Sequence, residues 1–304
     1  MIDTLKFEID RRHFDYKELH DLMYNKFEYV CIRKYKHGDS INFKYKNWLF
    51  FLTKNKFVAT GSLNKLFHGN NLVPISFKEV KNGLDSLYEV LKFDISDAKI
   101  KQIDIGHNLV MNQDVNSYLD LIVAPVGFKP WKLSNETLYL KKNDNVSEIV
   151  FYNKFKEAKS KNKTLMFNNE NILRYELKLK KNIKEILGDN SLVSLYNVDT
   201  YSKLIKAWYE SYVSIPKITQ PVSSKIQLAS KKSLTDWLIK EGIKANGGIE
   251  VIFNAVTNSK LDKNIRYKIR KLLKSIDDLE YLNPQLKEEL DYRIEAVYLH
   301  QQAA

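Results

Sequence analysis

The chain is poor in the residues and motifs that define several common classes of protein. It has 304 residues but only 1 cysteine, 10 glycines and 6 prolines. The single cysteine, Cys31, excludes an internal disulfide and any zinc site built from several cysteines. The sequence has no Walker loop, no GxGxxG segment, no Cys/His zinc spacing and no nucleophile-elbow motif. These absences argue against the nucleotide-binding and hydrolase classes that depend on such motifs.

Long apolar runs are also missing. No stretch approaches the roughly 20 apolar residues that cross a membrane. The first residues lack the charged start and apolar run of a signal peptide. We therefore expect a cytoplasmic protein without a membrane span. Hydrophobic content is 44%, which is enough to build a packed core.

Negative charge is scarce relative to positive charge. The chain carries 49 Lys and Arg against 37 Asp and Glu, for a net charge of +12. A protein this basic usually meets a polyanion. Nucleic acid is our first choice and an anionic membrane the second. A lysine-rich composition that only keeps the protein soluble is the remaining alternative.

Three segments alternate apolar and polar residues, which predicts half-buried β-strands over 103–106, 149–154 and 173–179. Successive side chains of a strand point to opposite faces. The apolar residues would face the core, and the polar residues the other side. The predicted polar face carries Asp104, Tyr152, Lys154, Arg174, Glu176 and Lys178. Two carboxylates, a phenol and several cations on one face suit metal-assisted attack of tyrosine on a phosphodiester.

Asp104 lies between two isoleucines, where a carboxylate is costly to bury unless it is paired or bound to a metal. The simpler alternative is a solvated strand face. His107 is a further candidate metal ligand. Strict alternation puts it on the face opposite Asp104, so it reaches the site only if Gly106 marks a β-bulge.

Tyr152 is the candidate nucleophile, although the chain has 18 tyrosines and an ordinary strand tyrosine would look the same. A tyrosine has a pKa near 10 and needs activation. A divalent cation would polarise the phosphate, and Lys154 could stabilise the charge of the transition state. Glu176 would ligate the metal, or it would form a cross-strand salt bridge with its cationic neighbours.

The segment that follows Tyr152 is strongly basic. It carries Lys156, Lys159, Lys161 and Lys163. A solvated loop is one interpretation. A loop this basic beside the candidate nucleophile would also contact DNA phosphates.

Helix signals frame these strands. Asp15 with Glu18, and Ser76 with Glu79, have the spacing of a capping box before an apolar stripe. From about residue 182 the pattern becomes helical. A segment over 214–232 that contains two prolines and several serines reads as a linker. We therefore predict an α+β protein, with an antiparallel sheet, helices on one face, and a helical C-terminal domain.

The same residues resemble the phage and plasmid rolling-circle replication initiators of the filamentous-phage gene II/X type. The resemblance covers roughly residues 1–215 and rests on the order and spacing of short motifs. These motifs are Met1-Ile2-Asp3, Ser62 with Lys65 and Gly69-Asn70-Asn71, Ile103-Asp104, Tyr152-Asn153-Lys154, and Arg174-Tyr175-Glu176. Gln102 stands where the family usually has Arg. The His-hydrophobe-His metal motif of the wider superfamily is absent.

The resemblance implies an enzyme that nicks one DNA strand at a replication origin and becomes joined to the 5′ phosphate. Tyr152 would be the nucleophile, with Lys154 stabilising charge. Asp104 and Glu176, with His107 as a third candidate, would bind Mg²⁺ or Mn²⁺. Tyr139 resembles the nucleophile of related plasmid initiators and is the reserve candidate. Lys65, Arg174 and Lys178 are further expected DNA contacts.

The predicted organisation is a nicking domain over 1–215 and a helical domain over 222–304 that binds DNA or a partner. Expected partners are single- and double-stranded origin DNA, with host helicase and polymerase, and no membrane. A non-catalytic DNA-binding initiator or regulator is the alternative from another class. An RNA-binding protein is a third, which the same charge would permit.

Overall fold

The computed structural model describes residues 1–34, 39–72, 74–134, 136–142, 146–160, 171–217, 242, 255–256, 259, 262–274 and 284–303. Contacts divide the chain into two units. One unit is Met1–Lys217 with Leu286–Ala304, and the other is Ile218–Gln285. The sequence-based division assigned all of 222–304 to a second domain. The structure differs because the last helix belongs with the first unit.

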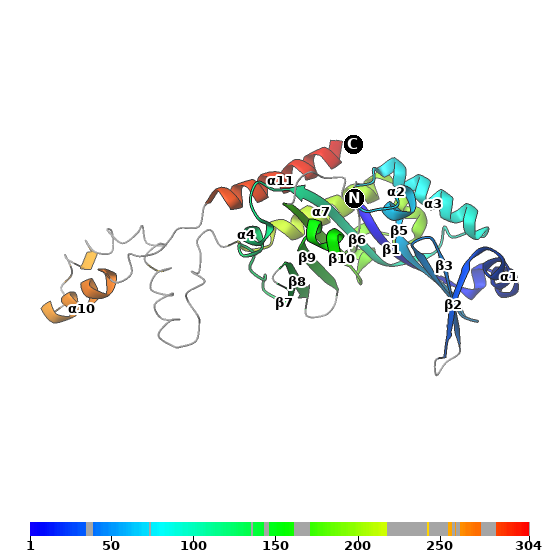
Figure 1. The fold of residues 1–304 in the computed structure, drawn as a ribbon, viewed down its shortest axis with the longest axis horizontal. Helices are drawn as coiled ribbons and strands as arrows, with labels where there is room; N and C mark the ends of the chain where they lie inside the picture. Colours follow the sequence, from blue (N-terminus) through cyan, green and yellow to red (C-terminus); the bar gives the residue numbers. More distant parts are fainter. Residues whose placement is uncertain are drawn as a thin grey trace. The chain divides into compact units, whose positions relative to one another are not determined.

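The first unit is built on one antiparallel sheet of 10 strands. Their order across the sheet is β2-β3-β4-β5-β1-β6-β10-β9-β8-β7. Figure 1 shows the sheet with β2 and β3 towards one end and β7 and β8 towards the other. The strands are β1 Ile2–Asp10, β2 Glu28–Arg33, β3 Ser40–Tyr45, β4 Trp48–Leu52, β5 Lys56–Ser62, β6 Lys99–Val110, β7 Phe128–Ser134, β8 Thr137–Lys142, β9 Ser147–Asn153 and β10 Ile172–Leu179. The central strands β1, β6 and β10 come from segments far apart in the sequence, so the sheet joins the beginning of the chain to its middle.

The helices begin where the sequence places caps. Asp15 accepts hydrogen bonds from the backbone of the first helical turn, and Ser76 and Glu79 form a capping box, so both predicted helix starts are confirmed. The helices are α1 Tyr16–Lys26, α2 Leu63–His68, α3 Phe77–Leu91, α4 Val115–Leu119, α5 Lys154–Ser160, α6 Ile183–Leu187, α7 Val198–Val213, α10 Lys263–Lys274 and α11 Pro284–Ala303. Short 3₁₀ turns span Arg11–His13 and Leu192–Tyr196.

One face of the sheet forms the core. Ile103 and Ile105 of β6 and Tyr175 and Leu177 of β10 alternate onto this face, and all four are buried. The hydroxyl of Tyr175 donates to the carbonyl of Trp208 at 2.9 Å, and the two rings lie 4.9 Å apart. Helix α7 therefore covers this face. The predicted direction of these apolar side chains is confirmed.

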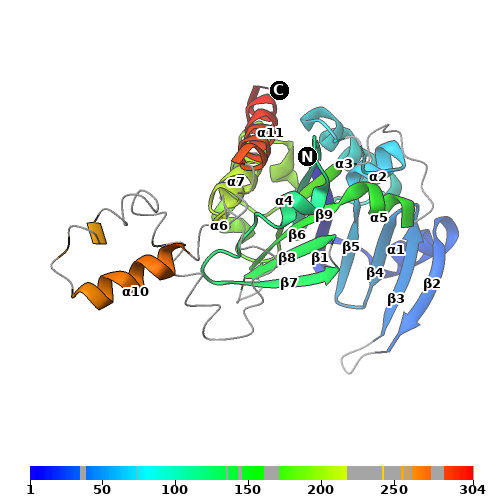
Figure 2. The same cartoon turned by 60° about the vertical axis from the view of Figure 1, so that its left-hand side comes forward.

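Helix α11 returns to the same layer (Figure 2). Leu290 and Ile294 are buried. Asp291 accepts a hydrogen bond from the Tyr212 hydroxyl at 2.5 Å, and the ring of Tyr298 stacks on Tyr209 of α7 at 4.2 Å. Helices α7 and α11 thus pack together, which confirms an α+β fold with a helical C-terminal region.

The other face of the sheet is polar and carries six of the residues singled out by the sequence, namely Asp104, Tyr139, Tyr152, Arg174, Glu176 and Lys178. Among the described residues, no helix combines the length and the apolar composition that crossing a membrane requires. The functional question therefore concerns what the polar face can bind and do.

Candidate active site

Strand register places the candidate residues in three rows on the polar face. Directly opposite residues of antiparallel strands share a face. The first row is Thr137, Tyr152, Arg174 and Asn108, the second Tyr139, Val150, Glu176 and Gly106, and the third Lys141, Glu148, Lys178 and Asp104. The sheet therefore brings the candidate nucleophile, both candidate carboxylates and several cations onto adjacent rows.

Arg174 is the centre of the site. Its guanidinium is buried and donates to Asp3 through Nη2 and to Glu176 through Nε, both at 2.5 Å. Nη1 donates to Oδ1 of Asn108 at 2.9 Å. Burial acts to lower the pKa of Arg174, but the carboxylates of Glu176 and Asp3 raise it above its usual value. A fixed positive charge therefore holds two carboxylates from distant segments.

Asp3 links the site to the segment after β5. Its carboxylate accepts hydrogen bonds from Ser62 Oγ at 2.7 Å and from Asn71 Nδ2 at 3.2 Å. Burial acts to raise the pKa of Asp3, but Arg174 and these hydrogen bonds hold it below its usual range. Ser62 Oγ also accepts from the backbone N–H of Lys65 and so caps α2. The short motif around residues 62–71 thus folds against the first strand.

Tyr152 lies one residue before the end of β9. Its hydroxyl donates to Oε1 of Glu176 at 3.1 Å. Burial, followed by the negative charge of Glu176, raises the pKa of Tyr152 well above its ordinary value. A neutral phenol is a poor nucleophile, so Tyr152 needs a proton acceptor, and Glu176 is in contact with it.

Lys154 departs from the predicted strand. It is the first residue of α5 because β9 ends one residue earlier, so the assignment of Tyr152 and Lys154 to one strand was wrong. Its Nζ nevertheless lies 5.7 Å from the centre of the Tyr152 ring. Nζ donates to Asn71 Oδ1 at 3.0 Å and to Glu157 at 2.7 Å. Burial, followed by Arg174, lowers the pKa of Lys154. Lys154 therefore lies beside Tyr152 as predicted, but α5 holds it there and not the strand.

Asp104 is the least compensated carboxylate of the site. It accepts a hydrogen bond from Gln102 Nε2 at 2.9 Å, and Lys178 Nζ is 4.0 Å away. Burial raises the pKa of Asp104 to about 7, and the charge of Lys178 offsets this only in part. Glu176 also lies near Lys178, at 3.5 Å. One ammonium thus faces both candidate metal ligands.

His107 does not join these carboxylates. The pairing of β6 with β10 continues without a bulge through Gly106, and His107 is paired with Tyr175 on the core face. Burial, followed by the positive chain terminus, lowers the pKa of His107 to about 3. Its proposed role as a ligand shared with Asp104 is wrong, because strand alternation turns its side chain to the helix layer.

The two carboxylates have the right chemistry to bind a hard divalent cation, but their arrangement allows it only if Lys178 moves away. Asp104 and Glu176 supply oxygen ligands of the kind that Mg²⁺ and Mn²⁺ take. In the described part of the chain, no group of three or more His, Cys, Asp or Glu could hold a metal ion. A cation shared by the two carboxylates would have to displace the ammonium of Lys178. That side chain is 24% exposed.

The expected DNA contacts are unevenly placed. Lys65 lies in α2 near Asp3, and Lys156 and Lys159 lie in α5. Lys156 forms an ion pair with Glu136 at 2.5 Å. Lys161 and Lys163 lie outside the described residues. Arg174 and Lys178 belong to the site itself, where both are engaged with carboxylates.

Tyr139 lies on the same face as Tyr152. The two are diagonal neighbours on β8 and β9, a relation that separates side chains by about 7–8 Å. The ring of Tyr139 is 5.4 Å from the ring of Trp131 on β7. The reserve nucleophile is therefore close to the site but belongs to an aromatic pair at its rim.

Three further residues of the site were not among the candidates: Asp3, Asn71 and Gly106, the last of which was considered only as a possible β-bulge. Asp3 and Asn71 belong to motifs that pointed to the family without suggesting a contact. Gly106 is explained by space. A Cβ there would lie 2.8 Å from Cγ of Glu176 and 3.0 Å from Nη2 of Arg174. The absence of a side chain at Gly106 lets both groups cross β6.

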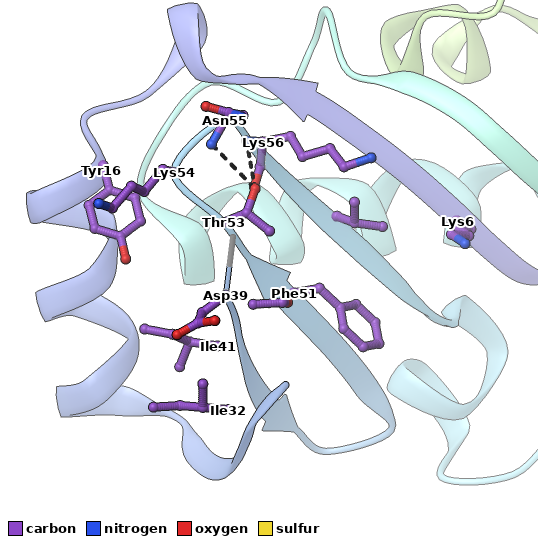
Figure 3. Close-up of a pocket in the computed structure, with 12 residues that line it drawn as sticks. Lys6, Tyr16, Ile32, Asp39, Ile41, Phe51, Thr53, Lys54, Asn55 and Lys56 are labelled. Carbon is purple, nitrogen blue, oxygen red and sulfur yellow. Dashed lines mark hydrogen bonds between the residues drawn. The ribbon is translucent and has the colours of Figure 1, made fainter. Parts of the chain in front are cut away.

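A pocket of about 990 Å³ lies elsewhere on the first unit (Figure 3). Its walls include Tyr16 of α1, Ile41 of β3, Phe51 of β4 and Val58 of β5. None of the described candidate site residues lines it. The chemistry-bearing groups are therefore gathered on the polar face of the sheet and not in this pocket.

Comparisons with known proteins find a distant likeness only. No protein-family model and no curated protein matches the chain. A solved structure described as a rolling circle replication initiator protein from Geobacillus stearothermophilus is 12% identical, with a TM-score of 0.42. The match covers 77% of this chain and 93% of that chain. At this level the likeness supports no role for any residue, so function has to be argued from the site itself.

Proposed function

We propose that this protein is a replication initiator that cleaves and rejoins one DNA strand through a covalent bond to Tyr152. The proposal rests on one observation, that segments distant in the sequence come together at one place. Segments around residues 3, 62–71, 104, 152–154 and 174–176 meet in one network of hydrogen bonds and ion pairs on the polar face. A purely structural role does not require a phenol, three carboxylates and three cations to be gathered at one buried position.

The contacts support a specific division of labour. The phenolic oxygen of Tyr152 attacks phosphorus, and its proton passes to Glu176, which already accepts its hydrogen bond. The bond between phosphorus and the 3′ oxygen breaks. The 5′ phosphate stays on Tyr152, and the 3′ oxygen takes up a proton from water to become a free hydroxyl. Host polymerase and helicase are the partners that this product calls for.

The surrounding cations orient the carboxylate of Glu176 and neutralise charge on the phosphoryl group. Arg174 fixes the carboxylate of Glu176 that receives the proton. Lys154, held against the Tyr152 ring, offsets the charge that develops on the phosphoryl group. Mg²⁺ or Mn²⁺ held by Asp104 and Glu176 would polarise the phosphate when bound.

The test is formation of a protein–DNA adduct. Wild type, Tyr152→Phe and Tyr139→Phe proteins are incubated with Mn²⁺ and a pool of single-stranded oligonucleotides labelled at the 3′ end, which stays on the protein, and are then separated on a denaturing gel. We expect an adduct with wild type and with Tyr139→Phe, and none with Tyr152→Phe. That variant lacks only one oxygen and should bind DNA within a few-fold of wild type.

Two arms of the same assay examine the metal and the alternative. A chelator, or the double substitution Asp104→Asn with Glu176→Gln, should abolish the adduct, and full activity of the double variant would exclude this metal site. An adduct that depends on Tyr139 would show that Tyr139, and not Tyr152, is the nucleophile. DNA binding without any adduct would favour the non-catalytic initiator or regulator, for which the ion pairs of Arg174 are purely structural.

A further inference from the structure

An exposed tryptophan lies on the strand at the edge of the sheet. Trp131 on β7 is 48% exposed, whereas Trp48 and Trp208 are fully buried. A single exposed aromatic residue is common on protein surfaces and has no meaning by itself. Its surroundings decide whether it can bind a ligand.

Trp131 belongs to a cluster of aromatic rings and cations. Its ring is tilted by 40° from that of Tyr139, with centres 5.4 Å apart. Nζ of Lys141 lies 4.4 Å from the Trp131 ring and 5.9 Å from the Tyr139 ring. Rings beside a cation offer a flat apolar surface for a base and a charge for its phosphate.

The charges of this cluster favour an anionic partner. Lys129 is paired directly with Lys141 across β7 and β8. Like charges opposite one another on a sheet are unfavourable. Glu148 is 3.9 Å from Lys141, but it also accepts a hydrogen bond from Lys180 at 2.5 Å. A phosphate beside Lys129 and Lys141 would relieve their repulsion.

The cluster adjoins the candidate site. Tyr139 is paired with Val150, and Val150 with Glu176. Two strand spacings separate Tyr139 from Glu176, which is about 10 Å. A nucleic-acid strand lying across Tyr152 therefore has a neighbouring nucleotide within reach of the aromatic pair.

We infer that Trp131, Tyr139 and Lys141 form a subsite that stacks one unpaired base of single-stranded DNA beside the proposed cleavage site. The inference rests on the proposed function for its choice of DNA as the ligand. A duplex keeps its bases stacked inside and cannot offer one to the rings. The subsite would position the strand, while Tyr152 carries out the reaction.

The experiment measures binding of an oligothymidylate of about eight nucleotides, within the site sizes of single-strand binders. All proteins carry Tyr152→Phe, so that no cleavage intervenes. Trp131→Ala should weaken binding roughly tenfold or more, and Trp131→Phe should keep most of the affinity. Tyr88→Ala is the matched control, because Tyr88 on α3 is 49% exposed. Tyr88→Ala should bind like the parent, which is the protein that carries Tyr152→Phe alone.

Two further arms separate stacking from charge and from damage to the fold. An abasic oligonucleotide of equal length should bind the parent protein more weakly, and Trp131→Ala should remove most of that difference. Lys141→Ala should lower the magnitude of the log–log salt slope by about 0.7, whereas Trp131→Ala should leave it unchanged.

Equal binding of thymidylate by Trp131→Ala and the parent would overturn the subsite. So would an equal loss in Tyr88→Ala, or tighter binding of oligouridylate than of oligothymidylate. These outcomes do not depend on adduct formation. If the parent binds through Trp131 but the wild type forms no adduct, the proposed cleavage fails and the subsite stands.

Discussion

At the residue scale, Asp104 shows that the site is not arranged for stability. Its carboxylate is buried, one amide donates to it, and the nearest ammonium is 4.0 Å away. The folded state therefore favours the protonated form, with a pKa of about 7. A buried carboxylate that is destabilised at neutral pH is typical of functional sites.

This pKa predicts a pH dependence of stability. An unfolded aspartate titrates near pH 4, so between about pH 4 and pH 7 the folded state holds a proton that the unfolded state has lost. Stability from this group is present at low pH and declines as pH rises towards 7. A shift of about three pKa units corresponds to about 4 kcal/mol at most.

Asp104→Asn mimics the protonated acid and should remove that decline. We expect the variant to match wild type near pH 4 and to be more stable by a few kcal/mol at pH 8. Urea denaturation in chelator at several pH values checks this. Asp21→Asn is the control, because the Asp21 side chain is 58% exposed. A wild-type-like pH profile for Asp104→Asn would contradict the prediction.

At the element scale, the contacts of α11 with α7 show that the last helix belongs to the helix layer on the core face of the sheet. Its buried side is narrow and consists of Leu286, Leu290 and Ile294, which face the rest of the first unit. Polar contacts flank this stripe, and Glu289 accepts a hydrogen bond from Tyr118 at 2.5 Å. The helix therefore contributes both apolar burial and fixed orientation.

Two leucines of α11 make a matched pair. Leu290 is fully buried and Leu299 is 59% exposed. Leu290→Ala should lower the free energy of unfolding by roughly 2–5 kcal/mol, because it removes apolar contacts and leaves a cavity. Leu299→Ala should change it by about 0.5 kcal/mol or less. Denaturant unfolding measures both, and equal effects would mean that α11 is not docked as described.

At the scale of the whole molecule, residues 218–285 form a unit inserted between α7 and α11. Both flanking helices belong to the first unit, where Lys217 Nζ is 3.4 Å from Asp291. Helix α10 in the inserted unit is rich in Lys and Arg. Its DNA-binding role stays a prediction, as do the separate roles first assigned to 1–215 and 222–304.

Replacing 218–285 with a short Gly/Ser linker should leave the first unit folded and able to form the adduct. If α10 contacts phosphates, duplex binding should lose about 0.9 from the magnitude of the salt slope for each contact removed. Truncation after Lys217 is the contrasting variant. It also removes α11 and should destabilise the first unit. An unchanged salt slope in the linker variant would argue against a DNA-binding role.

The sequence by itself determined which side chains share a face within each strand and where α1 and α3 begin. Alternation is a property of a few neighbouring residues, so Asp104 and Glu176 could be assigned to the polar face before any pairing was known. The caps at Asp15 and Ser76 are equally local.

Only the tertiary structure decided what those faces meet. The ion pair of Asp3 with Arg174 joins residues 171 positions apart and depends on the strand order β1-β6-β10. Register excluded His107, and the helix that follows β9 placed Lys154. The burial of the polar face, the return of α11 and the meeting of Trp131 with Tyr139 also depend on the path of the whole chain. Local sequence patterns do not reveal that path. The alternation within a strand involves only its own few residues, whereas the strand with which it pairs comes from a distant part of the sequence.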